Sequence, residues 1–128
     1  MRSRFEIEYT LNTPVRVLYE RLSTPEGLSE WFADNVTVED DIFTFYWDQT
    51  EARAKLAYAR ENKAVKFIWL DFPEPESNFF EFRIIIHELT GDIALLITDH
   101  AEEDEVEDAR DLWDTQISYL KKVLGLTE

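Results

Sequence analysis

The sequence contains no cysteine, only three glycines and only four prolines. Without thiols the chain can form neither disulfides nor thiolate metal ligands. Three glycines cannot build a glycine-rich loop of the kind that cradles phosphates. No apolar run approaches the roughly 20 residues that cross a membrane, and residues 1–15 lack the apolar stretch of a secretory signal. We therefore expect a cytoplasmic protein without a membrane span.

Positive charge is scarce as well, because 13 Lys and Arg residues stand against 28 Asp and Glu residues. The resulting net charge of −15 repels phosphate backbones, so the composition predicts no nucleic-acid partner. Aromatic residues are plentiful, at 14% of the chain, which is typical of an ordered protein rather than a disordered one. A chain of 128 residues is long enough to bury a core without disulfides, and we expect residues 1–128 to form one domain.

The longest predicted element is a helix from Asp104 to Leu124. Its apolar residues recur every three or four positions and form one stripe: Val106, Ala109, Trp113, Ile117, Leu120 and Leu124. Asp104 is the expected N-cap, with Glu107 at the capping-box spacing, and Gly125 is the expected end of the helix. A helix of about 30 Å needs a sheet against which it can bury such a stripe.

Alternating apolar and polar residues predict seven strands, at residues 4–11, 36–38, 42–47, 51–60, 64–70, 79–88 and 92–100. Most breaks between them are short and polar, which favours antiparallel neighbours, and Thr90-Gly91 is expected to form a tight hairpin. Two short helices follow the first strand, with Thr13 and Ser23 as their expected N-caps. The pattern predicts an α+β fold of two layers.

Several segments of the sequence form a combination typical of one family: the run STPEGLSEWFAD at residues 23–34, and further segments at residues 43–47, 80–82, 88–92, 97–99 and 112–114. Together they resemble a bacterial START-like family. That family belongs to the helix-grip, birch-allergen-like superfamily, which includes activators of a heat-shock chaperone ATPase. The resemblance implies a helix-grip (START-like) fold: a curved antiparallel sheet of about seven strands, two short helices after strand 1, and a long C-terminal helix across the sheet. It implies little about function, because the superfamily spans lipid carriers, hormone receptors, aromatases and chaperone activators.

Few side chains support metal or catalytic chemistry. His87 lies on the polar side of its strand and is expected at the surface, whereas a local ion pair with Asp99 is expected to account for His100. The seven acids between Asp99 and Asp108 lack the pattern and the glycine of a calcium loop; they fit either the start of a helix or a surface for a basic partner. No serine lies in a G-x-S-x-G setting. The sequence predicts no metal, no cofactor and no catalytic residue.

Aromatic side chains supply the remaining candidate site. Those of three strands and two helices are expected to bound a hydrophobic cavity together with one isoleucine: Trp31, Phe32, Phe45, Trp47, Phe67, Trp69, Phe82, Trp113 and Ile117. Packing of the same rings into a solid core remains open as the alternative. Arg53 and Tyr58 lie in opposite phases of one strand, so both can point inward only if a bulge intervenes.

Three functions follow from these observations. The first is a small intracellular binding protein that holds a hydrophobic or amphipathic small molecule between the sheet and the C-terminal helix. The alternative is a co-chaperone-like protein-interaction module that presents its acidic surface to a protein partner. An enzyme of the cyclase or aromatase type is the third.

Overall fold

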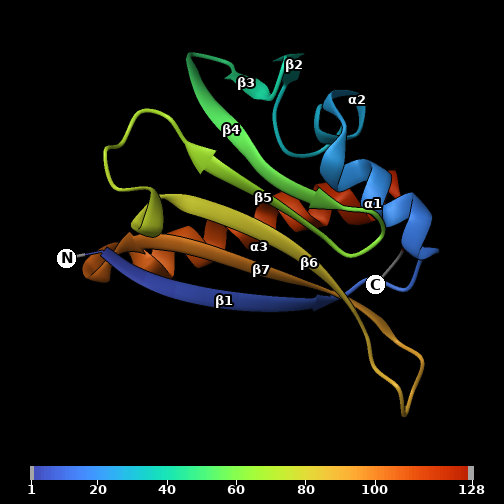
Figure 1. Cartoon of the computed structure of the whole chain (residues 1–128). Helices are drawn as coiled ribbons and strands as arrows, with labels where there is room; N and C mark the ends of the chain where they lie inside the picture. Colours follow the sequence, from blue (N-terminus) through green and yellow to red (C-terminus); the bar gives the residue numbers. More distant parts are fainter. Residues whose placement is uncertain (1, 127–128) are drawn as a thin grey trace.

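The computed structural model describes residues 2–126 and forms two layers, a curved sheet and a long helix behind it (Figure 1). The sheet is antiparallel, with strand order β1-β7-β6-β5-β4-β3-β2. Its strands are β1 (Arg2–Thr10), β2 (Asn35–Glu39), β3 (Ile42–Trp47), β4 (Thr50–Arg60), β5 (Ala64–Trp69), β6 (Phe79–Ile86) and β7 (Ile93–Glu102). The helix α3 (Val106–Val123) lies across one face. The predicted seven strands and terminal helix are confirmed.

Two short helices, α1 (Val15–Ser23) and α2 (Pro25–Leu28), connect β1 to β2. Neither predicted N-cap is correct. Pro14 occupies the cap position of α1 and no side chain caps that helix, so Thr13 lies one residue too early. Thr24 caps α2, because its side chain accepts a hydrogen bond from the Gly27 N–H at 2.9 Å. The second error arises because Ser23 and Thr24 are both suitable caps, and tertiary packing selects one.

The start of α3 also differs from the prediction. A 3₁₀ turn, η2 (Glu103–Glu105), precedes the helix, and the cap position carries no side-chain hydrogen bond. The capping box of Asp104 and Glu107 is therefore wrong. Acids still occupy the first turn and lysines the last, which is the order that the helix dipole favours. Gly125, with φ of 75°, ends the helix as expected.

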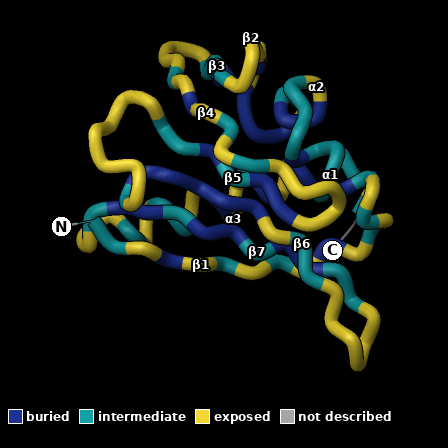
Figure 2. Tube along the Cα trace, viewed as in Figure 1, coloured by how far each residue is buried: buried dark blue, intermediate teal, exposed yellow. Residues whose placement is uncertain are grey.

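The β6–β7 hairpin is longer than the predicted two-residue turn. His87 N–H donates to the Asp92 carbonyl at 2.9 Å, and Gly91 N–H donates to the His87 carbonyl at 2.7 Å. The loop therefore spans residues 88–91, with Gly91 at φ of 77°, where a residue without Cβ is favoured. Figure 2 shows this hairpin projecting into solvent, away from the buried centre of the sheet. A second 3₁₀ turn, η1 (Pro75–Ser77), lies in the β5–β6 connection.

Tyr58 and Arg53 both point to the outer face of the sheet, away from α3. A bulge lies between Leu56 and Tyr58, so the phase of β4 changes there. The Tyr58 hydroxyl donates to the Glu81 carboxylate, which points away from the buried rings on either side of it in β6. Arg53 is exposed next to buried Ala54. The bulge therefore brings both side chains to the same face, and that face is the outer one.

The two histidines have different environments. His87 is at the surface, as predicted, and its Nε2 lies 2.8 Å from the Glu8 carboxylate. His100 is only 8% exposed and packs on the ring of Phe79, with its Nδ1 3.1 Å from the Phe79 carbonyl. The predicted ion pair with Asp99 is wrong, because neighbouring residues of a strand point to opposite faces. Burial lowers the pKa of His100 and favours its neutral form.

The core lies between the sheet and α3. Its largest fully buried side chains include the rings of Phe45, Phe67, Phe80 and Phe82. These rings contact one another, with centroids 5.1 Å apart for Phe67 and Phe80 and 5.5 Å apart for Phe80 and Phe82. The stripe of α3 completes the core, since Trp113, Ile117 and Leu120 are all buried. The predicted apolar face of α3 is confirmed.

Candidate functional site

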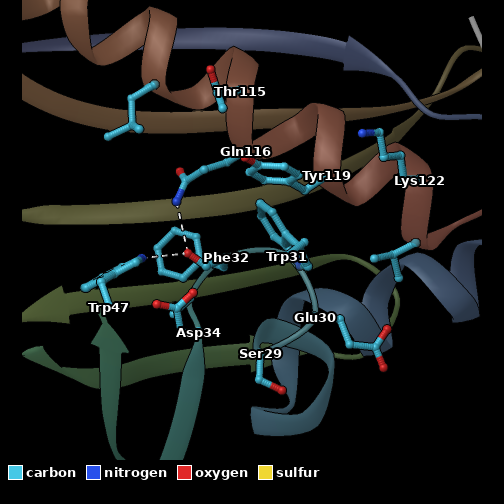
Figure 3. A pocket seen from close by; sticks show the side chains of 13 residues that line it. Ser29, Glu30, Trp31, Phe32, Asp34, Trp47, Thr115, Gln116, Tyr119 and Lys122 are labelled. Carbon is cyan, nitrogen blue, oxygen red and sulfur yellow. Dashed lines mark hydrogen bonds between the residues drawn. The ribbon is translucent and has the colours of Figure 1, made fainter. Parts of the chain in front are cut away.

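A groove open to solvent runs between α3 and the segment that joins α2 to β2, and its volume is about 840 Å³ (Figure 3). One wall is formed by residues 29–34 together with Trp47, at the end of β3. The other wall is the side of α3 that carries Leu112, Thr115, Gln116, Tyr119, Lys122 and Val123. We call this feature the α3 groove.

The segment at residues 29–34 is held firmly by backbone contacts. The Leu28 carbonyl accepts hydrogen bonds from the N–H groups of Trp31, Phe32 and Ala33, at 3.4, 2.9 and 3.3 Å. Upstream, a Cβ on Gly27 would lie 2.4 Å from the Glu20 carbonyl oxygen. Only glycine allows α2 to approach α1 this closely, and this approach sets where the following segment begins.

Phe32 joins the two walls at the base of the α3 groove. Its ring stacks on the ring of Trp113, with centroids 5.8 Å apart, and contacts Trp47 edge to face at the same separation. Its carbonyl accepts two hydrogen bonds of 3.0 Å, from Trp47 Nε1 and from Gln116 Nε2 (Figure 3). One residue thus links β3 and α3. The Trp47 ring and the Gln116 amide are held in fixed orientations as a result.

Charged groups lie along the rim. Glu30 forms an ion pair with Arg21, in which Oε1 lies 3.1 Å from Nε. Trp31 Nε1 donates to the Arg21 carbonyl at 2.9 Å, so the same residue of α1 orients this ring. Asp34 lies near Trp47 at one end of the groove, and Lys122 lies at the other end (Figure 3). An aromatic surface with opposite charges at its two ends suits an amphipathic molecule.

The most strongly perturbed carboxyl group lies elsewhere. Asp99 faces α3, where it accepts hydrogen bonds from Trp113 Nε1 and from its neighbour's backbone N–H, both at 2.8 Å. Burial raises the pKa of Asp99 to about 6, although both hydrogen bonds oppose the rise. Asp99 does not line the groove. No histidine is among the described residues that line it, and residues 2–126 contain no cluster of three potential metal ligands.

The structure separates the nine predicted site residues into two groups. Trp31, Phe32 and Trp47 line the α3 groove. The other six lie outside its lining, in the core or packed against it: Phe45, Phe67, Trp69, Phe82, Trp113 and Ile117. The core rings touch one another, because large rings converging from three strands fill the space between sheet and helix. The hollow lies beside this core rather than within it.

The wall formed by α3 was missed from the sequence. Leu112, Gln116, Tyr119 and Val123 are spaced by four, three and four residues, which is helical spacing. This second stripe lies next to the buried one, and Leu112 and Tyr119 remain 60% and 50% exposed. Two large apolar side chains on the solvent side of an amphipathic helix were the available signal.

Comparison with known proteins gives one family and several similar structures. The model of the START-like superfamily domain matches residues 1–126. A Bacteroides fragilis protein, solved in solution, is 37% identical and superposes with a TM-score of 0.67; the match covers 99% of this chain and 94% of that one. No curated protein matches the chain significantly.

Two more distant structures share the fold. The Aha1 dimer from Colwellia psychrerythraea is 17% identical, with a TM-score of 0.78 and coverage of 95% of this chain and 96% of that one. An AHSA1-like protein from Aeromonas hydrophila is 11% identical, with a TM-score of 0.70 and coverage of 98% and 96%. At these identities the likeness shows the fold alone.

Proposed function

Because the chain belongs to the START-like superfamily, we propose that it is a small binding protein that holds an amphipathic molecule in the α3 groove. The family and the fold support a small ligand-binding or interaction domain. The observation that carries the narrower proposal is the shape and lining of this groove. Its volume of about 840 Å³ lies within the range of roughly 300–1,000 Å³ that small-molecule sites occupy.

The groove is already arranged for binding. Trp31, Trp47 and Gln116 each donate a hydrogen bond to a backbone carbonyl, so their orientations are set without a ligand. A ligand that meets such fixed side chains loses little affinity to ordering them. The exposed side chains of Leu112 and Tyr119 and the half-buried ring of Trp47 provide apolar area for its body, and charged groups at the rim provide contacts for a polar end.

Binding can be tested with N-phenyl-1-naphthylamine, a neutral apolar dye that brightens when it leaves water. We expect saturable binding to the wild-type protein. Thr115→Trp should weaken it at least tenfold, because Thr115 lines the groove and the indole would fill the space. Ser118→Trp is the matched control, since Ser118 is an exposed residue of the same helix outside the lining.

Equal dye binding by the two variants would place the dye elsewhere and contradict the proposal. Absence of binding to the wild-type protein would do the same if native mass spectrometry of protein purified from its own host also shows the bare chain. Both variants should melt within a few degrees of the wild type, which ensures that lost binding reflects the groove.

One observation favours a protein-interaction module as the second function. Leu112 and Tyr119 carry large side chains at the edge of the groove, and these are 60% and 50% exposed. Apolar side chains of this kind are enriched where partner proteins bind. If no small molecule binds and Thr115→Trp abolishes capture of a protein from the host lysate, while Ser118→Trp retains it, the groove holds a protein segment instead.

A further inference from the structure

The two walls of the α3 groove differ in the hydrogen-bond donors that they leave available. Along residues 29–34, every backbone N–H already donates to a carbonyl of the chain. Those of Ser29 and Glu30 bond to Pro25 and Gly27, the next three bond to Leu28, and that of Asp34 bonds to Tyr46 at 2.9 Å. This wall therefore has no backbone N–H with which to bind an anion.

The polar side chains near this wall are also occupied as donors. Trp31 Nε1 and Trp47 Nε1 each donate to a backbone carbonyl. The Ser29 hydroxyl donates to the Glu26 carbonyl at 2.8 Å. On the opposite wall, the Thr115 hydroxyl donates to the Asp111 carbonyl at 3.2 Å, and one of the two Gln116 Nε2 hydrogens is donated to the Phe32 carbonyl. An indole has a single donor, so neither tryptophan has an N–H left for a ligand.

The wall formed by residues 29–34 also carries a carboxylate, that of Asp34, which is available to a ligand. Among the described residues, Asp34 has no ion-pair or side-chain hydrogen-bond partner, whereas Glu30 is paired with Arg21. Asp34 is exposed and lies beside Trp47, because its own N–H is bonded to the Tyr46 carbonyl. A cation placed here meets a free carboxylate and an adjacent indole ring, both of which attract positive charge.

An anionic head group would meet few groups in the groove that could bind it. Lys122 is the only basic residue among the described residues that line the groove, and it lies at the far end from Asp34 (Figure 3). The net charge of −15 lowers the local concentration of anions and raises that of cations around the whole molecule. The occupied donors, the free carboxylate and the net charge of the protein therefore all favour a positively charged ligand.

We propose that the ligand of the α3 groove is a cationic amphiphile, an alkyl or aryl ammonium ion whose head lies against Asp34 and Trp47 and whose apolar body lies between Trp31 and Tyr119. This inference rests on the proposed function and adds the chemical class of the ligand. Any acceptor group on the body of the molecule would face α3, where the Tyr119 hydroxyl and the Lys122 ammonium have no hydrogen-bond or ion-pair partner among the described residues.

The test compares three molecules that share a twelve-carbon chain and differ in the head group: dodecyltrimethylammonium, dodecyl maltoside and dodecanoate. Each displaces the neutral dye N-phenyl-1-naphthylamine, below its micelle concentration and at physiological salt, which screens long-range attraction. We expect the ammonium compound to bind at least tenfold more tightly than the maltoside, and dodecanoate to bind most weakly.

Two variants with the same net charge distinguish a direct contact with Asp34 from attraction by the overall negative charge of the protein. Asp34→Asn should bring the affinity for the ammonium compound close to that for the maltoside. Asp71→Asn, at an exposed position outside the groove, should retain the tenfold preference. Equal loss of preference in both variants, or tighter binding of dodecanoate, would overturn the inference.

The outcomes also distinguish the inference from the proposed function. If the three compounds displace the dye equally well, the groove binds amphiphiles without regard to charge; the cationic class is then wrong and the binding function stands. If the dye does not bind the wild-type protein and native mass spectrometry of protein purified from its own host also shows the bare chain, the binding function itself fails.

Discussion

Two neighbouring stripes of α3 meet the rest of the molecule in different ways. Trp113, Ile117 and Leu120 are at most 5% exposed and are covered by the sheet. One position away around the helix, Leu112 and Tyr119 are at least half exposed and border the groove. The sheet closes on the first stripe, whereas residues 29–34 face the second from a distance set by Gly27 and the Leu28 carbonyl. The hollow lies above Phe32, whose ring and carbonyl join the opposite wall to α3 at the base of the groove.

The largest loss of stability is expected from Trp113→Ala. Its ring contacts Phe32, Phe80 and Phe82, and its removal should cost about 3–5 kcal/mol in the free energy of unfolding. Urea denaturation followed by circular dichroism measures this change. Trp113→Phe is the control: it keeps an aromatic ring but leaves Asp99 without the indole donor, and should cost about 1–3 kcal/mol. A midpoint unchanged in Trp113→Ala would show that the two stripes do not differ in their contribution to stability.

The buried stripe should also make stability depend on pH through Asp99. Its pKa in the folded protein is about 6, above the roughly 3.9 of an unfolded chain, so between these values the folded state binds more protons. The contribution of Asp99 is therefore fully present below pH 4 and is lost as the pH rises through 6.

Asp99→Asn removes this titration. We expect the free energy of unfolding of the variant, relative to the wild type, to rise by roughly 2–3 kcal/mol between pH 4 and pH 7. Urea titrations of both proteins at four pH values measure the difference, in which the other carboxylates cancel. A difference that does not vary with pH, or that varies in the opposite direction, would show that Asp99 is ordinarily solvated.

Introducing a larger side chain should lower stability on the buried side of α3 and change it little on the side that faces the groove. Ile117 is 1% exposed, so Ile117→Trp should overpack the core and cost about 1–3 kcal/mol. Thr115→Trp enters the hollow and should change stability little while blocking dye binding. Thermal melting and dye titration of the pair provide the comparison. If Ile117→Trp is as stable as the wild type, the core contains unfilled space and is not sharply separated from the groove.

The smallest effect is expected from Tyr119→Ala. Half of this side chain is exposed and it borders the hollow, so its removal should change the free energy of unfolding by no more than about 0.5 kcal/mol. Phe72→Ala is the matched control, because Phe72 is an aromatic residue of similar exposure outside the groove. Only Tyr119→Ala should weaken dye binding. Similar binding by the two variants would remove Tyr119 from the site.

The sequence by itself determined the elements, their order and the face that each buries. Phe5 in β1, Leu11 directly after it, and Trp113 and Leu120 in α3 are buried where the period of two or of 3.6 places them. Such periods depend only on residues near one another in the chain. The caps were less predictable, since Ser23 and Thr24 are both suitable and only the packing of α2 on α1 selects Thr24. His100 was mistaken for a partner of Asp99, although the alternation of the strand excludes this contact.

Only the tertiary structure decided which aromatic rings form the core and which line the groove. Phe45 and Trp47 are two residues apart on β3 and point to the same face, yet Phe45 is fully buried and Trp47 lines the groove. Their sequence pattern is the same. Both rings contact Phe32, but their other neighbours differ. Phe45 also packs against Phe67 and Phe80 from two other strands, whereas Trp47 donates to the Phe32 carbonyl, which Gln116 of α3 also binds. A ring is enclosed or left accessible according to how closely distant segments approach, and that distance is set by long-range packing rather than by local sequence.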